Sequence, residues 1–203
     1  MKMKLPLLPL AGLVAFPGTE VLLSVDANSP VVDGDNVGLV HLRNDGQLSS
    51  IGGLATATEQ KLGLEGFRML SCEVTSRFRI LELDEESSPT YATVTEAHED
   101  EPVTSDAAPL CDDLRQRLGD LRKLHAQVDG VDAGAAPSID ELSPTAFSLA
   151  LAGIMEHENL ADAQALLEST DTLARLDKLD ARLSEAVKLT STQAMLQRLG
   201  MGS

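Results

Sequence analysis

The sequence predicts an α+β fold in which a β-rich half, residues 1–101, precedes an α-helical half, residues 102–203. Up to residue 101, short apolar and β-branched runs are separated by Gly, Asn and Asp turns, a pattern typical of a small antiparallel barrel or two-sheet sandwich. After Pro102 the leucines recur at helical spacing, which predicts long amphipathic helices. The chain is therefore predicted to contain an antiparallel β subdomain followed by a helical bundle.

The opening segment predicts an extended chain and then a turn. Leu5–Leu10 alternates prolines with leucines, which removes amide donors and favours a first or edge strand over a helix. Phe16-Pro17-Gly18 then predicts a tight turn, because proline fixes φ and glycine accepts a positive φ. A second strand is expected at Val21–Val25.

Five further strands are predicted, at residues 37–43, 51–59, 66–74, 77–83 and 90–96. The first of them ends at Asn44-Asp45-Gly46, a strong hairpin-turn signal. Polar and apolar residues alternate imperfectly along 77–83, so both faces of that strand are expected to be partly covered.

Four helices are predicted, at about residues 110–128, 144–154, 160–169 and 171–188, with a loop over 129–143. Ser143 and Asp171 are the expected N-caps, and Pro144 follows Ser143 at the first helical position. Leu173, Leu176, Leu179, Leu183 and Val187 form the expected inward stripe of the last helix. No helix is apolar all round, so the stripes are expected to pack against one another in a bundle.

Composition narrows the class of protein. The chain is 43% hydrophobic and 24% charged, which is ordinary for a globular protein, and it has no apolar run near the roughly 20 residues that cross a bilayer. The net charge of −16 is spread over both halves, so nucleic acid is excluded as an expected partner. Pro6 and Pro9 argue against a signal peptide. Cys72 and Cys111 are too few for a disulfide framework, which indicates reduced thiols and a cytoplasmic location.

Catalytic motifs are not evident in the sequence. It has no Gly-x-x-x-x-Gly-Lys-Ser/Thr loop for nucleotide phosphates. Ser184 and Lys188 lie four residues apart on a predicted helix and read as a polar surface pair. His157-Glu158 lacks the second histidine of a zinc-peptidase helix, because residue 161 is alanine. We therefore expect a non-enzymatic protein without cofactor or metal.

Several segments occur in an order known from one protein family. Ile51–Ala57 is similar to a family strand of the type Val-Gly-Thr-Leu-Ala-Arg-Ile, and Arg77-Phe78-Arg79 stands where the family has Arg-Phe-Arg. Ala163–Glu168 matches a Gln-x-Leu-Leu-Glu element, and Arg175-Leu176 an Arg-Leu pair. With the opening Leu5–Leu10, these segments resemble the amino-terminal substrate-binding domain of Lon-type ATP-dependent proteases, in its stand-alone form and related to the Lon-like domain of cereblon.

The resemblance implies a PUA-like β subdomain and a module that binds unfolded or degron-bearing polypeptides without cutting them, with a AAA+ protease as a possible partner. One segment departs from the family: residues 26–36 replace a helix that carries aromatic residues and arginine, and we expect a loop there, or at most one helical turn. Two alternatives stay open: a scaffold or adaptor unrelated to proteolysis, and a small-ligand-binding protein. The ending Leu199–Ser203 favours a stand-alone protein over a protease fragment.

The candidate protein-binding residues are Phe16, Pro17, Arg77, Phe78 and Arg79. Recognition of unfolded chains requires exposed apolar surface or an open strand edge, and these residues lie in the predicted turn and strand. The alternative is that Phe16 and Phe78 are core anchors. Likewise, Arg77 and Arg79 either clamp carboxylates of a partner or only neutralise acidic neighbours.

Overall fold

The computed structural model describes residues 2–62, 66–84, 87, 89–99, 105–129, 139, 141–155, 157 and 159–199. The chain divides into two compact units. The strand unit comprises Met1–Asp100 together with Leu149–Thr170, and the helical unit comprises Glu101–Ser148 together with Asp171–Ser203. The predicted division into 1–101 and 102–203 differs from these units by one residue at the boundary and by residues 149–170, which group with the strands.

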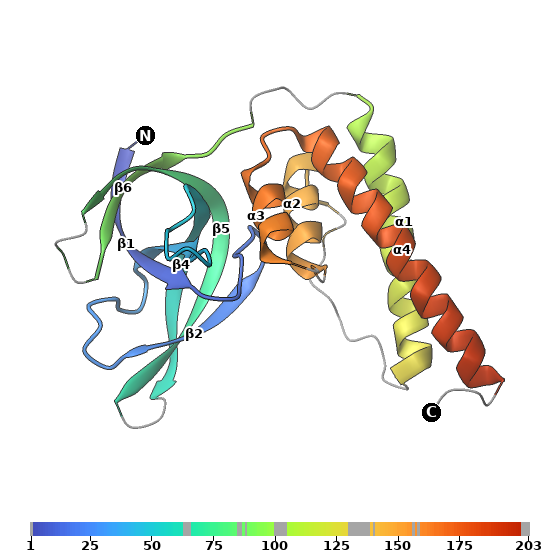
Figure 1. The fold of residues 1–203 in the computed structure, drawn as a ribbon, viewed down its shortest axis with the longest axis horizontal. Coiled ribbons are helices and arrows are strands. Elements are labelled where there is room, and N and C mark those ends of the chain that lie inside the picture. The colour runs from blue at the N-terminus through green and yellow to red at the C-terminus, as the bar shows by residue number, and fades with distance from the viewer. Residues whose placement is uncertain are drawn as a thin grey trace. The chain divides into compact units, whose positions relative to one another are not determined.

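Six strands form the sheet of the strand unit: β1 (Lys2–Leu10), β2 (Glu20–Asp26), β3 (Asn36–His41), β4 (Ile51–Leu62), β5 (Phe67–Asp84) and β6 (Tyr91–Glu96). They follow the order β2-β5-β4-β3-β1-β6, and β5 also pairs with β6. The pairings β5-β4-β3-β1-β6 therefore return to β5 and close a ring, which Figure 1 shows as a curved barrel. The expected barrel was wholly antiparallel, but β1 and β3 run parallel.

The long strand β5 corrects the prediction of two strands at 66–74 and 77–83. It runs unbroken for 18 residues. Thr75 and Ser76, which look like a polar break in the sequence, lie at a β-bulge where the register with β4 shifts between Leu54 and Ala55. Such a bulge bends a strand without ending it. One continuous strand can therefore pair with β2, β4 and β6 along its length.

Strand β1 is the first strand, as expected, and in the strand order it lies between β3 and β6. Its first part, Lys2–Pro6, pairs with β6, and its second part, Leu7–Leu10, pairs with β3. The amide of Leu7 donates to the carbonyl of Thr90, which places Pro6 at a position whose nitrogen points away from β6. Pairing with β3 begins only after Pro6, so its missing amide interrupts neither ladder.

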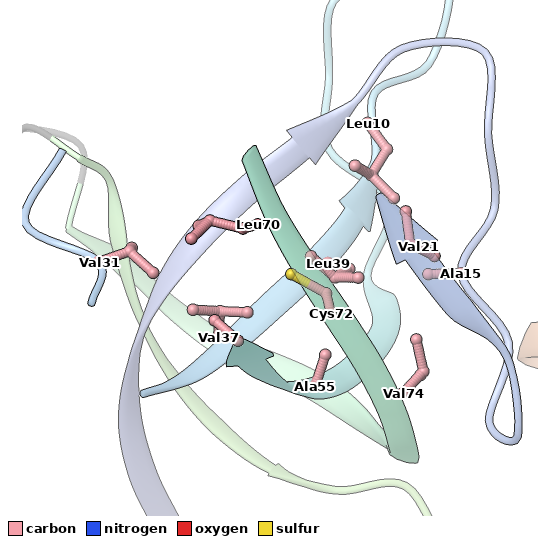
Figure 2. Packing of buried hydrophobic residues seen from close by; sticks show 11 residues of the cluster. Leu10, Ala15, Val21, Val31, Val37, Leu39, Ala55, Leu70, Cys72 and Val74 are labelled. Carbon is pink, nitrogen blue, oxygen red and sulfur yellow. The ribbon is translucent and has the colours of Figure 1, made fainter. Parts of the chain in front are cut away.

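Among the described residues of the strand unit, buried apolar side chains form two clusters. One gathers side chains from β1 to β5 and from the loops that follow β1 and β2, and Figure 2 shows the labelled members between the strands. The cluster consists of Leu10, Ala15, Val21, Val31, Val37, Leu39, Ala55, Ala57, Leu70, Cys72 and Val74. The other contains Leu5, Leu7, Val40, Phe78, Ala92 and Val94. Aromatic residues are almost absent from both, as the composition predicts.

The turns follow the sequence signals. Gly18 and Gly46 have φ values of 84° and 80°, as the Phe16-Pro17-Gly18 and Asn44-Asp45-Gly46 turns require. The segment 26–36 is a loop, as expected, apart from Asp26 and Asn36, which belong to β2 and β3. Arg68 fixes this loop, because its Nη2 donates to the carbonyls of Ser29 and Val31 at 2.6 and 2.8 Å.

The helical unit is built around α1 (Ala107–Asp129) and α4 (Thr172–Arg198). Hydrogen bonds from Arg117 to Ser184 and between His125 and Thr190 show that the two helices run side by side in the same direction, as Figure 1 also shows. The predicted stripe of α4 is buried at Leu176, Leu179 and Leu183 and half-buried at Leu173 and Val187. Of the helices described, none is long and apolar enough to cross a membrane.

Two shorter helices, α2 (Pro144–Ile154) and α3 (Leu160–Glu168), complete the fold. The predicted caps are present: Ser143 Oγ accepts from the amide of Ala146, and Asp171 Oδ1 from that of Ala174. The predicted bundle of four helices needs correction, because α3 contacts β4 and groups with the strands, as does the second half of α2. The predicted loop over 129–143 lies largely outside the described residues.

Candidate functional site

Two of the segments noted in the sequence face each other in the sheet. Gly52 on β4 is paired directly with Phe78 on β5. A Cβ built at Gly52 would lie 2.8 Å from Cζ of Phe78, and one built at Gly38 on β3 would meet the same atom at 2.8 Å. The two glycines therefore make room for the Phe78 ring, which is 1% exposed. This explains why a glycine-containing strand and an Arg-Phe-Arg strand occur together.

Arg77 connects the sheet to α3. Its side chain is buried, and Nη1 donates to the carbonyls of Leu167 and Ser169 at 2.6 and 2.7 Å. These carbonyls lie at the C-terminal end of α3, where helix carbonyls lack intrahelical partners and the helix dipole favours a cation. Nη2 of Arg77 also donates to Oε1 of Glu99 at 2.6 Å. Arg77 thus has a structural role: it ties α3 to the sheet and neutralises the carboxylate of Glu99.

Gln164 makes the complementary connection from the helix side. Its Nε2 donates to the carbonyl of Ile51 on β4 at 3.0 Å and to Oε1 of Glu168 at 2.8 Å. Both glutamine and glutamate belong to the Gln-x-Leu-Leu-Glu element, whose two leucines, Leu166 and Leu167, are buried. The element therefore holds α3 against the barrel. Its sequence pattern reflects this packing role.

The Phe16-Pro17-Gly18 turn is also packed inside the strand unit. Phe16 is 2% exposed, Pro17 is buried, and the ring of His157 stacks on Phe16 with centroids 5.9 Å apart. Nε2 of His157 lies 2.7 Å from the carbonyl oxygen of Ala152, so the imidazole is held in place at the end of α2. A Cβ at Gly153 would lie 2.9 Å from Cβ of Phe16, which shows how closely α2 approaches the turn.

Only one of the five predicted binding residues is exposed. Phe16, Pro17 and Phe78 are buried in the core, and Arg77 is buried where it binds α3. The structure therefore corrects the expectation of accessible apolar surface at these positions. Arg79 alone points to solvent. The residues are brought into one unit by the fold, but they do not form a common surface.

Accessible apolar surface occurs instead on the outer face of β2 and β5. Leu22 is 62% exposed and Phe67 is 50% exposed, and Met69 lies half-buried between their register positions. This surface, which we call the β2 face, carries carboxylates at its ends: Glu20, Asp26 and Glu73. The sequence held a signal for it, since Val21, Leu23 and Val25 alternate inward and leave Leu22 as the one apolar residue among outward polar ones.

The β2 face borders an open strand edge. Among the described residues, β2 pairs only with β5. The amide of Ala27 donates to Gly66, and the amide of Val74 donates to Thr19, so the odd-numbered residues of β2 are the ones bonded to β5. The alternation leaves the N–H and C=O groups of Leu22 and Ser24 directed toward the free edge.

Ser184 and the two cysteines, the potential nucleophiles outside the β2 face, have structural surroundings. Ser184 Oγ accepts a hydrogen bond from Nη1 of Arg117 at 2.8 Å. Burial raises the pKa of the Cys72 thiol to about 11 and also raises that of Cys111, which keeps both thiols protonated near neutral pH. Within the part of the chain that is described, no cluster of His, Cys, Asp and Glu has the composition of a metal site.

Comparisons with known proteins agree on one family. A model of the ATP-dependent protease La (LON) substrate-binding domain matches residues 4–184. The N-terminal domain of Mycobacterium avium complex Lon protease is similar with a TM-score of 0.68 and 18% identity over 90% of this chain and 98% of that one. A Lon N-terminal domain protein from Xanthomonas campestris gives 0.60 and 20%, covering 88% and 98%. No protein with a curated description matches significantly.

The two solved structures, at such low identity, establish the shared fold, whereas the family model spans most of the sequence itself. The mixed architecture of a six-stranded sheet and helices is common to them. The chain therefore belongs to the family of Lon substrate-binding domains.

Proposed function

We propose that this protein is a non-catalytic module that binds unfolded or degron-bearing polypeptides. The observation that carries the proposal is the β2 face, where Leu22 and Phe67 present apolar side chains to solvent beside an open strand edge. Unfolded chains differ from folded ones in exposing apolar side chains and unpaired backbone, and this surface offers partners for both. Membership of a substrate-binding family supports the same conclusion.

The affinity is expected to be weak. A site of broad specificity cannot be complementary to one partner, and an unfolded client loses conformational entropy when it binds. We propose a AAA+ protease as a partner, because a protease that receives the client would make the weak binding step irreversible. We expect neither ATP hydrolysis nor peptidase activity from this chain, and we propose the cytoplasm as its location because both cysteines are buried free thiols. The PUA-like character of the barrel stays a prediction.

The experiment compares one globular protein in two forms, native and reduced with its thiols alkylated so that it cannot refold. Fluorescence anisotropy should show binding of the alkylated form only. The double substitution Leu22→Thr with Phe67→Thr should weaken that binding strongly. Leu81→Thr is the matched control, since Leu81 is an exposed leucine, 46% accessible, elsewhere on β5.

Equal binding of native and alkylated protein, or of neither, would contradict the proposal. Absence of any client binding would favour the scaffold alternative. If the double variant binds the alkylated client as tightly as the Leu81→Thr control does, the β2 face is not the binding surface. Client binding itself would still be established.

A further inference from the structure

The open edge of β2 has a defined pattern of groups. Glu20, Leu22, Ser24 and Asp26 all lie on the exposed face of β2, and the backbone groups of Leu22 and Ser24 are directed outward. The carbonyl of Asp26 already accepts from the amide of Ser29, so the open stretch ends there. The edge is therefore short, with Leu22 and Ser24 at its centre and carboxylates at both ends.

Among the side chains that the structure describes on β2 and the paired part of β5, the charges on this face are acidic. Glu20 and Glu73 are cross-strand partners with exposed side chains, and Asp26 is opposite Phe67. Arg68, the basic residue nearest on β5, is turned to the other side, where it holds the carbonyls of Ser29 and Val31. The edge thus carries a local negative potential that favours basic groups at the ends of whatever pairs with it.

We propose that the edge of β2 binds a client segment as an added β-strand, and that it selects segments with apolar residues at the centre and basic residues at the ends. This inference rests on the proposed function and specifies the class of client segment. Backbone hydrogen bonds to Leu22 and Ser24 supply affinity that is independent of side chains. The side chains opposite Glu20, Leu22 and Asp26 supply the selectivity.

Synthetic peptides test the selectivity. The sequence Lys-Thr-Val-Thr-Val-Thr-Lys, with short flexible flanks, places both lysines and both valines on one face. Because the pattern reads the same in both directions, it fits either strand polarity. The matched control, Glu-Thr-Val-Thr-Val-Thr-Glu, keeps the β propensity and reverses the charge. We expect the glutamate version to bind at least about tenfold more weakly at low salt, and the difference to shrink as salt screens the ends.

Backbone pairing is tested on both partners. Ser24→Pro removes the outward amide at a position where an edge strand tolerates proline, and Ser24→Ala is its control. Loss of one backbone hydrogen bond should weaken peptide binding about threefold to tenfold, against little change for Ser24→Ala. With the unaltered protein, N-methylation of alternate amides along one edge of the peptide should abolish binding, while methylation along the other edge should leave it.

The outcomes separate the inference from the proposed function. The inference is wrong, and client binding stands, if alkylated client protein binds but neither Ser24→Pro nor N-methylation along either peptide edge weakens peptide binding. If no client or peptide binds at all, both fail. If sedimentation shows a dimer that Ser24→Pro dissociates, a second copy of this chain occupies the edge, which also overturns the inference.

Discussion

The glycines around Phe78 allow a sharp test of the barrel interior. Gly38→Ala and Gly52→Ala each add one methyl group where the built Cβ meets Cζ of Phe78 at 2.8 Å. Overpacking of this kind costs about 1–3 kcal/mol of the free energy of unfolding. The two sites differ in the atom nearest to the built Cβ. At Gly38 it is a flexible side-chain atom, Cδ2 of Leu7 at 2.6 Å, whereas at Gly52 it is the carbonyl oxygen of Leu39 at 2.5 Å.

Combination with Phe78→Leu should therefore give different results. The smaller side chain removes the ring atoms, so it should relieve Gly38→Ala with a coupling free energy of about 0.5–3 kcal/mol. It cannot move the backbone oxygen beside residue 52, so Gly52→Ala should keep most of its penalty. The two double-mutant cycles share one partner substitution, which makes each the control for the other.

Urea unfolding followed by thiol labelling measures these energies in the strand unit alone. Cys72 lies in that unit and is 0% exposed, so it reacts only when the unit opens. Cys111 belongs to the helical unit and is removed as Cys111→Ala. Equal relief of Gly38→Ala and Gly52→Ala by Phe78→Leu, or relief of neither, would refute the packing described here.

Three further predictions concern single groups. Leu176→Ala should lower the free energy of unfolding by about 2–5 kcal/mol, because the side chain is 0% exposed; a change below about 0.5 kcal/mol in a urea titration would contradict its burial. Arg77→Met should cost about 3–5 kcal/mol because it removes the buried hydrogen bonds of Arg77 to Glu99 and to the carbonyls at the end of α3, whereas exposed Arg79→Met should change stability by less than about 0.5 kcal/mol; circular dichroism melts of the pair decide this. The native pKa of Cys72 lies above its unfolded value, so the native state holds the proton longer and stability should fall as pH rises from 9.0 to about 11; pH-dependent urea titrations should lose that slope in Cys72→Ala, and an unchanged slope would count against it.

Much of the fold follows from local sequence signals. Turn glycines, helix caps and leucine spacing act within a few residues, so the turns at Gly18 and Gly46 and the starts of α2 and α4 were predictable. Pairing partners were not. A period of two residues is the same in parallel and antiparallel strands, so nothing in Leu7–Leu10 announces its parallel partner β3.

The site was harder to predict because side-chain roles depend on distant contacts. Arg77 and Arg79 look alike in the sequence, but only Arg77 reaches the carbonyls at the end of α3, some 90 residues further along the chain. Phe78 looks like accessible strand surface until the facing Gly52 is identified. Leu22, in contrast, was within reach of alternation alone, since its neighbours on the same face are polar.

The strand unit is made of two stretches of chain, Met1–Asp100 and Leu149–Thr170, with part of the helical unit between them. On a ribosome that adds about 5–20 residues per second, roughly 4–14 s separate the end of the first stretch from the end of the second. Throughout that interval Arg77 has no α3 carbonyls to bind and Phe16 lacks His157. The nascent barrel is then incomplete, and a chain cut near residue 101 would remain so. During its own synthesis the protein therefore passes through a state that displays unfinished apolar surface to the cell's chaperones and proteases.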